Sequence, residues 1–220
     1  FMQSLNLIQQ LAIMALPLIF AVTVHEAAHA WVADKLGDDT ARSLGRVTFN
    51  PIPHIDLLGT IALPLGLYAL SALFGGAGFL FGYAKPVPVV ARRLRRPQRD
   101  MAWVALAGPG ANFAMALGWA LLFAAAPAWI DLFAGGGRFL AYTAIFGVMI
   151  NVFLMVLNLL PLLPLDGGRI LAAVLPPDWA RQYARTEPWG LFILLGLLFS
   201  GLLMPIILPI VQGLQHWLLA

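Results

Sequence analysis

The sequence predicts an all-α polytopic membrane protein, and this prediction comes from its composition and from the lengths of its apolar stretches. Of the 220 residues, 61% are hydrophobic and only 10% are charged, whereas soluble domains contain about 25% charged residues. Apolar stretches lie at about residues 5–33, 57–83, 101–127, 139–163 and 189–219. Because about 20 apolar residues span a bilayer as a helix, we expect about five to six transmembrane segments in a single domain.

The apolar stretches differ in whether one unbroken helix can cross the membrane. The first, third and fourth are expected to cross once each, whereas the other two contain helix breakers. Pro64 and a glycine cluster interrupt stretch 57–83, and Pro205 and Pro209 lie inside stretch 189–219. Broken backbone at membrane depth is tolerated only where it packs on protein or lines a watery cavity. The sequence leaves open whether each of these two stretches is single, double or re-entrant.

The basic residues of the loops predict how the stretches are oriented. Lysine and arginine are concentrated in loops 34–50, 85–99 and 166–188, whereas loop 128–138 holds a single arginine. The positive-inside rule places the first three loops in the cytoplasm. Stretch 57–83 then begins and ends on the cytoplasmic side, as a re-entrant hairpin or two short crossings. The net charge of +3 therefore reflects topology, and we expect no nucleic-acid partner.

The first stretch contains ionisable residues in the motif HEAAH at 25–29. Ionisable groups inside a membrane span are costly and indicate function. His25 and His29 are four residues apart, so they share one face of a helix. Two imidazoles in this arrangement can hold a zinc ion, and Glu26 between them can act on a water that the ion activates.

A catalytic zinc site normally has three protein ligands, so a third is expected elsewhere in the chain. Asp166 follows stretch 139–163, in the sequence NLLPLLPLDGG at 158–168. The loop charges make this stretch run in the same direction as the first one, which brings Asp166 to the depth of the HEAAH motif. Asp166 is therefore the predicted third ligand of one zinc ion per chain, with Asp56 as its competitor. The prolines are expected to end the helix and the two glycines to allow a tight turn.

The combination of HEAAH in one span with LDGG after a later one resembles the site-2 protease family of intramembrane zinc metalloproteases. The resemblance covers about residues 20–175 and includes the motifs AGPGAN at 107–112, NPIPHID at 50–56 and GYAKPVPV at 82–89. The last two of these motifs look like those of small bacterial members, and no PDZ-like insertion lies between stretches 101–127 and 139–163. The resemblance implies a catalytic core at about 5–175, followed by the C-terminal membrane segment at about 189–219.

The resemblance also implies roles for individual residues. His25, His29 and Asp166 would bind zinc, Glu26 would be the general base, and Asn158 would hydrogen-bond the substrate or the developing oxyanion. The substrate would lie near His54, Lys85, Pro86, Val87 and Pro88. Because proline resists helix and favours an extended edge, we expect segment 82–89 to pair with an unwound substrate as an added strand. Val90 departs from the family pattern, in which a polar residue is expected at this position.

Simpler roles remain open for several of these residues. Asn158 could bond between helices, His54 could be a loop residue without a catalytic role, and the motif at 107–112 could serve close helix packing, with Asn112 the open question.

The sequence therefore predicts an intramembrane zinc endopeptidase that cleaves peptide bonds in or near transmembrane helices of membrane proteins. We expect a multi-pass protein of a bacterial plasma membrane, in contact with the lipid bilayer and with its active site toward the cytoplasm. The alternatives are a membrane zinc transporter, which would need ionisable groups on several spans along one path, and a non-catalytic zinc-binding membrane protein.

Overall fold

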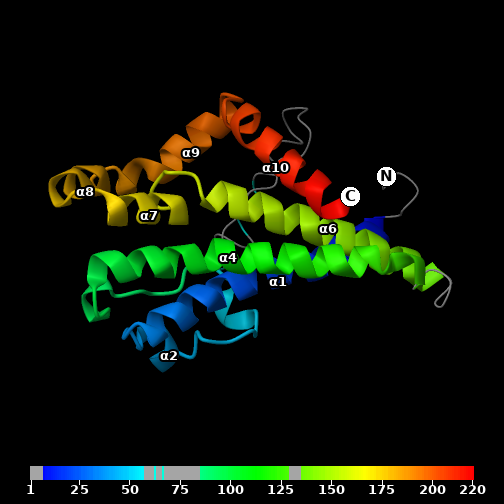
Figure 1. The fold of residues 1–220 in the computed structure, drawn as a ribbon, viewed down its shortest axis with the longest axis horizontal. Helices are drawn as coiled ribbons and strands as arrows, with labels where there is room; N and C mark the ends of the chain where they lie inside the picture. The colour runs from blue at the N-terminus through cyan, green and yellow to red at the C-terminus, as the bar shows by residue number, and fades with distance from the viewer. Residues whose placement is uncertain (1–6, 57–61, 63–65, 67–84, 129–134) are drawn as a thin grey trace.

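The computed structural model describes residues 7–56, 62, 66, 85–128 and 135–220, and every regular element in these ranges is a helix. Three of these helices are long and apolar enough to cross a membrane: α1 (Leu7–Lys35), α4 (Pro97–Ala124) and α6 (Gly135–Asn158). They pack against one another along much of their length (Figure 1). This confirms an all-helical protein in the described part of the chain, with apolar helices of membrane-spanning length.

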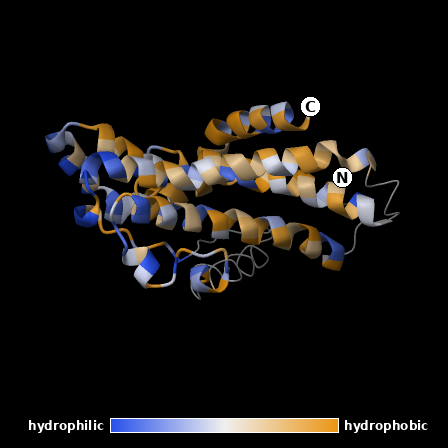
Figure 2. Cartoon of the chain, turned by 60° about the horizontal axis from the view of Figure 1, so that its bottom comes forward, coloured by the Kyte–Doolittle hydropathy of each residue, from blue (hydrophilic) through white to orange (hydrophobic). Residues whose placement is uncertain are grey.

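Helices α1 and α6 run in the same direction, and α4 runs opposite to both (Figure 1). Hydrogen bonds show that α1 and α4 are antiparallel, because His25 bonds to Asn112 whereas His29, one turn later in α1, bonds to Val104, earlier in α4. The relative directions expected from the loop charges are therefore observed. Hydrophilic residues gather at the end of the bundle where α1 ends and α4 begins, and hydrophobic residues cover most of the remaining length (Figure 2).

Prolines set several helix ends. Helix α4 begins at Pro97, where the missing N–H costs nothing because the first turn of a helix leaves its donors unpaired. Helix α6 ends at Asn158, shortly before Pro161. The chain then turns and begins α7 (Asp166–Val174), which is followed by α8 (Pro177–Ala184). The turn between α6 and α7 places the first residue of α7 next to α1.

The C-terminal stretch is broken, but not at its prolines. It contains the 3-10 helix η4 (Glu187–Trp189), α9 (Gly190–Phe199) and α10 (Leu203–Leu219). The helical stretch that ends at Phe199 and α10 meet at 82°, and Gly201 in the break has a φ of +74°, which side chains disfavour. Pro205 lies in the first turn of α10, and Pro209 is accommodated inside that helix. A glycine therefore makes the bend.

The remaining elements are short. They are α2 (Thr40–Ser43) and the 3-10 helices η1 (Ile52–His54) and η3 (Ala91–Arg93). Residues 85–90 have no regular secondary structure, and residues 82–84 lie outside the described part of the chain. The pairing of segment 82–89 with a substrate as an added strand therefore stays a prediction. Stretch 57–83 lies outside the described residues except for 62 and 66, so its re-entrant or double crossing stays a prediction.

The core that supports the site has an apolar part and a polar part. The apolar part lies between α4, α6, α9 and α10, where Val148, Val152 and Ile207 are fully buried. The polar part lies between α1, α4 and α6 and contains the fully buried Asn112 and Asn151. Polar groups inside such a bundle must find partners, and Asn112 is hydrogen-bonded both to Asn151 and to His25 of α1.

Candidate metal centre

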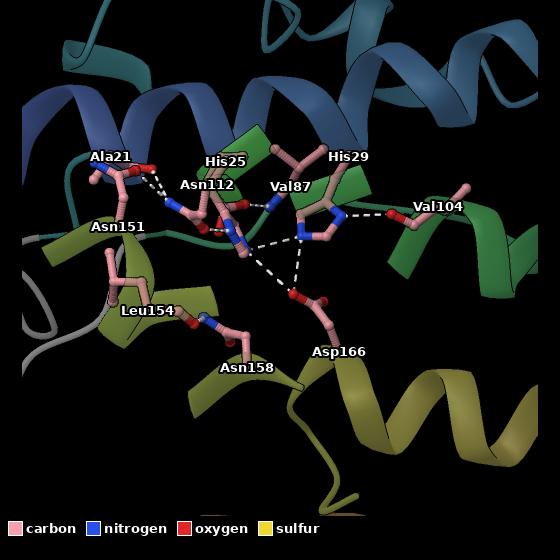
Figure 3. Close-up of polar contacts among 11 residues, drawn as sticks. Ala21, His25, His29, Val87, Val104, Asn112, Asn151, Leu154, Asn158 and Asp166 are labelled. Carbon is pink, nitrogen blue, oxygen red and sulfur yellow. Dashed lines mark hydrogen bonds and ion pairs between the residues drawn. The ribbon is translucent and has the colours of Figure 1, made fainter. Parts of the chain in front are cut away.

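Three potential metal ligands converge from two helices (Figure 3). His25 and His29 lie on one face of α1, and Asp166 is the first residue of α7. The two Nε2 atoms are 3.0 Å apart, and Asp166 Oδ2 lies 3.2 Å from that of His25 and 3.4 Å from that of His29. Tetrahedral zinc with bonds of about 2.0 Å separates its ligands by about 3.3 Å. The triangle therefore has the dimensions of one face of a zinc coordination sphere.

The other ring nitrogens determine what the histidines present to this triangle. His25 Nδ1 donates to Asn112 Oδ1 at 2.5 Å, and His29 Nδ1 donates to the Val104 carbonyl at 2.6 Å. In a neutral imidazole with a protonated Nδ1, Nε2 carries a lone pair. Asp166 Oδ2 is buried and accepts no hydrogen bond within the described ranges. Three buried acceptors that face one another repel unless a cation lies between them, so the residues fit a metal ion, and their N and O atoms suit zinc.

Asn112 orients the first of these histidines, a role that the sequence left open. Its Nδ2 donates to the Ala21 carbonyl at 3.2 Å and to Asn151 Oδ1 at 3.0 Å. Asn151 in turn donates to the Gly147 carbonyl at 2.9 Å. This chain of bonds fixes the amide of Asn112 with its oxygen toward His25. Such outer partners hold a ligand's ring and tautomer in place; the one signal in the sequence was a polar residue within an apolar span.

Gly108 provides the space that the imidazoles occupy. A Cβ at this position would lie 2.4 Å from His29 Nε2 and 2.5 Å from His25 Cε1. No side chain fits at these distances, because carbon atoms in van der Waals contact are about 3.5 Å apart. The motif at 107–112, interpreted from sequence as close helix packing, thus borders the metal centre directly.

The two glycines of the LDGG motif have a different role from the one expected. They lie in the first turn of α7, and neither has a positive φ, so they do not make a tight turn. A Cβ on Gly167 would instead lie 2.2 Å from the Leu159 carbonyl oxygen, and one on Gly168 would lie 2.4 Å from the Leu163 nitrogen. They allow the start of α7 to pack against the preceding turn, which positions Asp166.

A cavity of about 430 Å³ borders the three ligands, and its lining includes Glu26, Asn158, Pro86, Val87 and Val89. Glu26 Oε2 accepts a hydrogen bond of 2.9 Å from the Val87 N–H. Asn158 is half-buried, and its Nδ2 donates to the Leu154 carbonyl of its own helix at 3.0 Å. The structure therefore brings the predicted ligands, base and amide to one cavity.

The other residues expected near the substrate lie beside this cavity or away from it. Lys85 and Pro88 flank its lining residues in the chain but are not among them. His54 is buried in η1, where its Nε2 donates to the Thr48 carbonyl at 3.1 Å. Its backbone oxygen accepts the Lys85 N–H at 3.0 Å. His54 therefore holds the start of segment 85–90 through this backbone hydrogen bond and does not line the cavity.

Comparison with known proteins identifies the family. The model described as peptidase family M50 matches residues 129–201, which include α6 and Asp166. A relative named "Putative zinc metalloprotease YwhC", from Bacillus subtilis (strain 168), is 36% identical over 190 residues, which cover 86% of this chain and 81% of the relative. The chain belongs to peptidase family M50. This confirms the resemblance to the site-2 proteases.

Two other relatives share less of their own length with this chain. "Putative zinc metalloprotease Rip2" from Mycolicibacterium smegmatis is 31% identical over 186 residues, 83% of this chain and 64% of the relative. The protein of the same name from Mycobacterium tuberculosis (strain H37Rv) matches to the same extent. No solved structure gave a significant match. This M50 protein is thus a zinc metalloprotease with helices long and apolar enough to cross a membrane, and the group formed by His25, His29 and Asp166 is suited to hold its metal.

Proposed function

We propose that this metalloprotease is an intramembrane endopeptidase that hydrolyses peptide bonds in or near the transmembrane helices of membrane proteins. One observation carries this proposal: His25, Glu26 and His29 lie within α1, a helix apolar enough to cross a membrane, and line one cavity with Asp166. A peptide that reaches this cavity approaches within or beside the bilayer. We also propose a plasma-membrane location, and the basic loops at the polar end of the bundle favour an active site toward the cytoplasm.

Each polar residue of the cavity has a distinct role in the proposed reaction. A zinc ion would be held by His25, His29 and Asp166, where it would supply Lewis-acid activation of water and of the scissile carbonyl. Glu26 takes the proton from the attacking water and passes it to the leaving amine. One N–H of the Asn158 amide is used by Leu154, which leaves the second to donate to the scissile carbonyl oxygen as negative charge develops there.

The substrate must be unwound before it can react, because a peptide bond inside a helix is already hydrogen-bonded and shielded. Segment 85–90 is suited to hold the unwound chain. Proline fixes φ near −65° and pushes the preceding residue toward extended conformations, so Pro86 and Pro88 keep this segment out of helix. Its residues Val87 and Val89 line the cavity beside the ligands. Because the Val87 N–H is bonded to Glu26, an extended substrate can pair there with the Val87 carbonyl and with the backbone of Val89.

The test is a comparison of the purified protein with its Glu26→Gln variant, both reconstituted with a transmembrane peptide and zinc. We expect cleavage by the wild type and none by the variant, with equal zinc content in both, because glutamine keeps the size of the side chain but cannot take a proton. Equal cleavage in both proteins would remove Glu26 from the mechanism. Vectorial zinc movement across the vesicle without cleavage would instead identify a transporter.

A further inference from the structure

Arg46 is a buried cation that holds the backbone of segment 85–90. Only 7% of the residue is exposed, and its Nη2 donates to the carbonyl oxygens of Lys85 at 2.7 Å and Pro86 at 3.3 Å. In the part of the chain that the structure describes, none of the ion pairs includes Arg46. Burying a guanidinium without a carboxylate is costly, so the two carbonyls are its principal compensation.

Asp38 holds the other end of the same segment. It is fully buried, and its Oδ2 accepts the Val90 N–H at 2.6 Å while its Oδ1 accepts the N–H and the hydroxyl of Thr40. Burial raises the pKa of Asp38, but these hydrogen bonds and the nearby Arg93 outweigh burial and hold the pKa below its usual value. The carboxylate is therefore ionised at neutral pH, and its bond to Val90 is charge-assisted.

Between these two anchors, Val87 and Val89 line the cavity at the metal centre. The Val87 N–H bonds to Glu26, and it is the single backbone donor of the run Pro86 to Pro88, since proline has none. A shift of the segment along its own axis would therefore move the one donor that reaches Glu26. Arg46 and Asp38 act on opposite sides of this point, and neither lines the cavity.

We propose that Arg46 and Asp38 are positioning residues, which hold the backbone of segment 85–90 in one register beside the metal centre so that an unwound substrate can pair with it at Val87 and Val89. This inference rests on the proposed function. Neither residue was among the site residues predicted from the sequence, and both act through segment 85–90 and not by touching the substrate. The physical reason is pre-organisation: a segment already held in its binding conformation does not have to be ordered when the substrate arrives.

The first test measures the kinetics of Arg46→Met on a reconstituted transmembrane peptide. We expect KM to rise by about 10- to 100-fold, the scale of one or two lost bonds to a charged group, with zinc content unchanged. Arg46→Lys keeps the charge and a donor, so it should recover part of the loss. Asp38→Asn should raise KM independently, because it weakens the opposite anchor.

Arg42→Met is the matched control for the loss of charge. Arg42 lies in α2, in the same connection between α1 and η1, and pairs with Asp34. Its side chain is 64% exposed and makes no contact with segment 85–90 among the bonds of the described residues. We expect it to keep the wild-type KM. A rise in KM equal to that of Arg46→Met would overturn the proposal, because the effect would then follow from loop charge.

The second test detects the register directly. The chain contains no cysteine, so Val89→Cys, in the inactive Glu26→Gln background, introduces a unique thiol. In the presence of an added thiol oxidant, peptides with one cysteine at successive positions should form disulfides with a period of two, because alternate residues of paired extended chains share a face. Adding Arg46→Met should flatten this pattern while zinc is retained.

The outcomes separate this inference from the proposed function. If the wild type with zinc cleaves no peptide, the proposed function fails by itself. If cleavage occurs but Arg46→Met and Asp38→Asn keep the wild-type KM and disulfide pattern, the positioning role is overturned and the protease remains. Loss of zinc in both variants would also overturn it, because these side chains would then maintain the metal centre as a whole.

Discussion

Gly108→Ala tests the geometry of the metal centre most directly. Gly108 lies on α4, opposite the two histidines of α1, and an added Cβ would lie 2.4 Å from His29 Nε2 and 2.6 Å from His25 Nε2. These are the two nitrogens whose lone pairs face the metal position. A methyl group here therefore meets the ligating atoms themselves.

The distances give the size of the effect. Non-bonded atoms approach to about 3.5 Å, so the rings or α4 must withdraw by about 1 Å. Both rings are held at Nδ1 by bonds of 2.5 and 2.6 Å, so they cannot move without losing those partners. Disturbing such partners costs about 10- to 100-fold in metal affinity, and misplacement by about 1 Å can cost a further 10²-fold in rate. We expect zinc affinity to fall by about 100-fold.

The assay is competition for zinc between the purified protein and a chelator of known affinity, followed by peptide cleavage at saturating zinc. Gly110→Ala is the matched control, because it makes the same change two residues along α4, where nothing lies within 4 Å of the added Cβ. Both substitutions carry the same gain in helix propensity over glycine. Size-exclusion chromatography of both variants checks that each remains folded.

Equal zinc affinity in Gly108→Ala and Gly110→Ala would refute the expected clash. That result would mean that α4 does not approach the imidazoles as closely as the structure places it. A fall in cleavage with unchanged zinc affinity would also contradict it, because the clash involves the ligating nitrogens.

Two further substitutions test residues around the cavity. Asn112→Leu should lower zinc affinity by about 10- to 100-fold, because His25 loses the acceptor that holds its Nδ1–H; Asn151→Leu, one bond further from the metal, should have a smaller effect in the same chelator competition. Asn158→Ala should lower kcat by about 10²- to 10³-fold with zinc content unchanged, if its amide stabilises the developing negative charge; a lowered Tm with unchanged kcat would instead assign it to helix packing.

Much of the metal centre could be predicted from residue types and spacing. Ionisable residues within an apolar span are costly, so the HEAAH motif by itself indicated a site. The loop charges predicted that stretches 5–33 and 139–163 run in the same direction, which related Asp166 to a motif about 140 residues earlier in the chain. The structure bears out both the parallel direction and the convergence of His25, His29 and Asp166.

Other features could not be predicted because they depend on how helices meet. The sequence shows that Asn112 is polar, but its amide faces His25 only because Ala21 and Asn151, from two other helices, accept its donors. The glycines at 167 and 168 suggested a turn, whereas contact with the preceding turn explains them. Pro205 and Pro209 suggested where the last stretch breaks, whereas the bend lies at Gly201.

The sequence by itself determined that the chain has apolar helices long enough to cross a membrane, that its motifs resemble those of the site-2 proteases, and which residue types can hold zinc. The reason is that membrane insertion and metal coordination depend on composition and on local helical spacing. Only the tertiary structure decided how the metal centre is held. Gly108 lets α4 approach the imidazoles, and hydrogen bonds through Asn112 orient His25. Arg46 and Asp38 hydrogen-bond the backbone of segment 85–90. The physical reason is that close packing and buried hydrogen bonds join residues far apart in the chain, and no local pattern records which of them will meet.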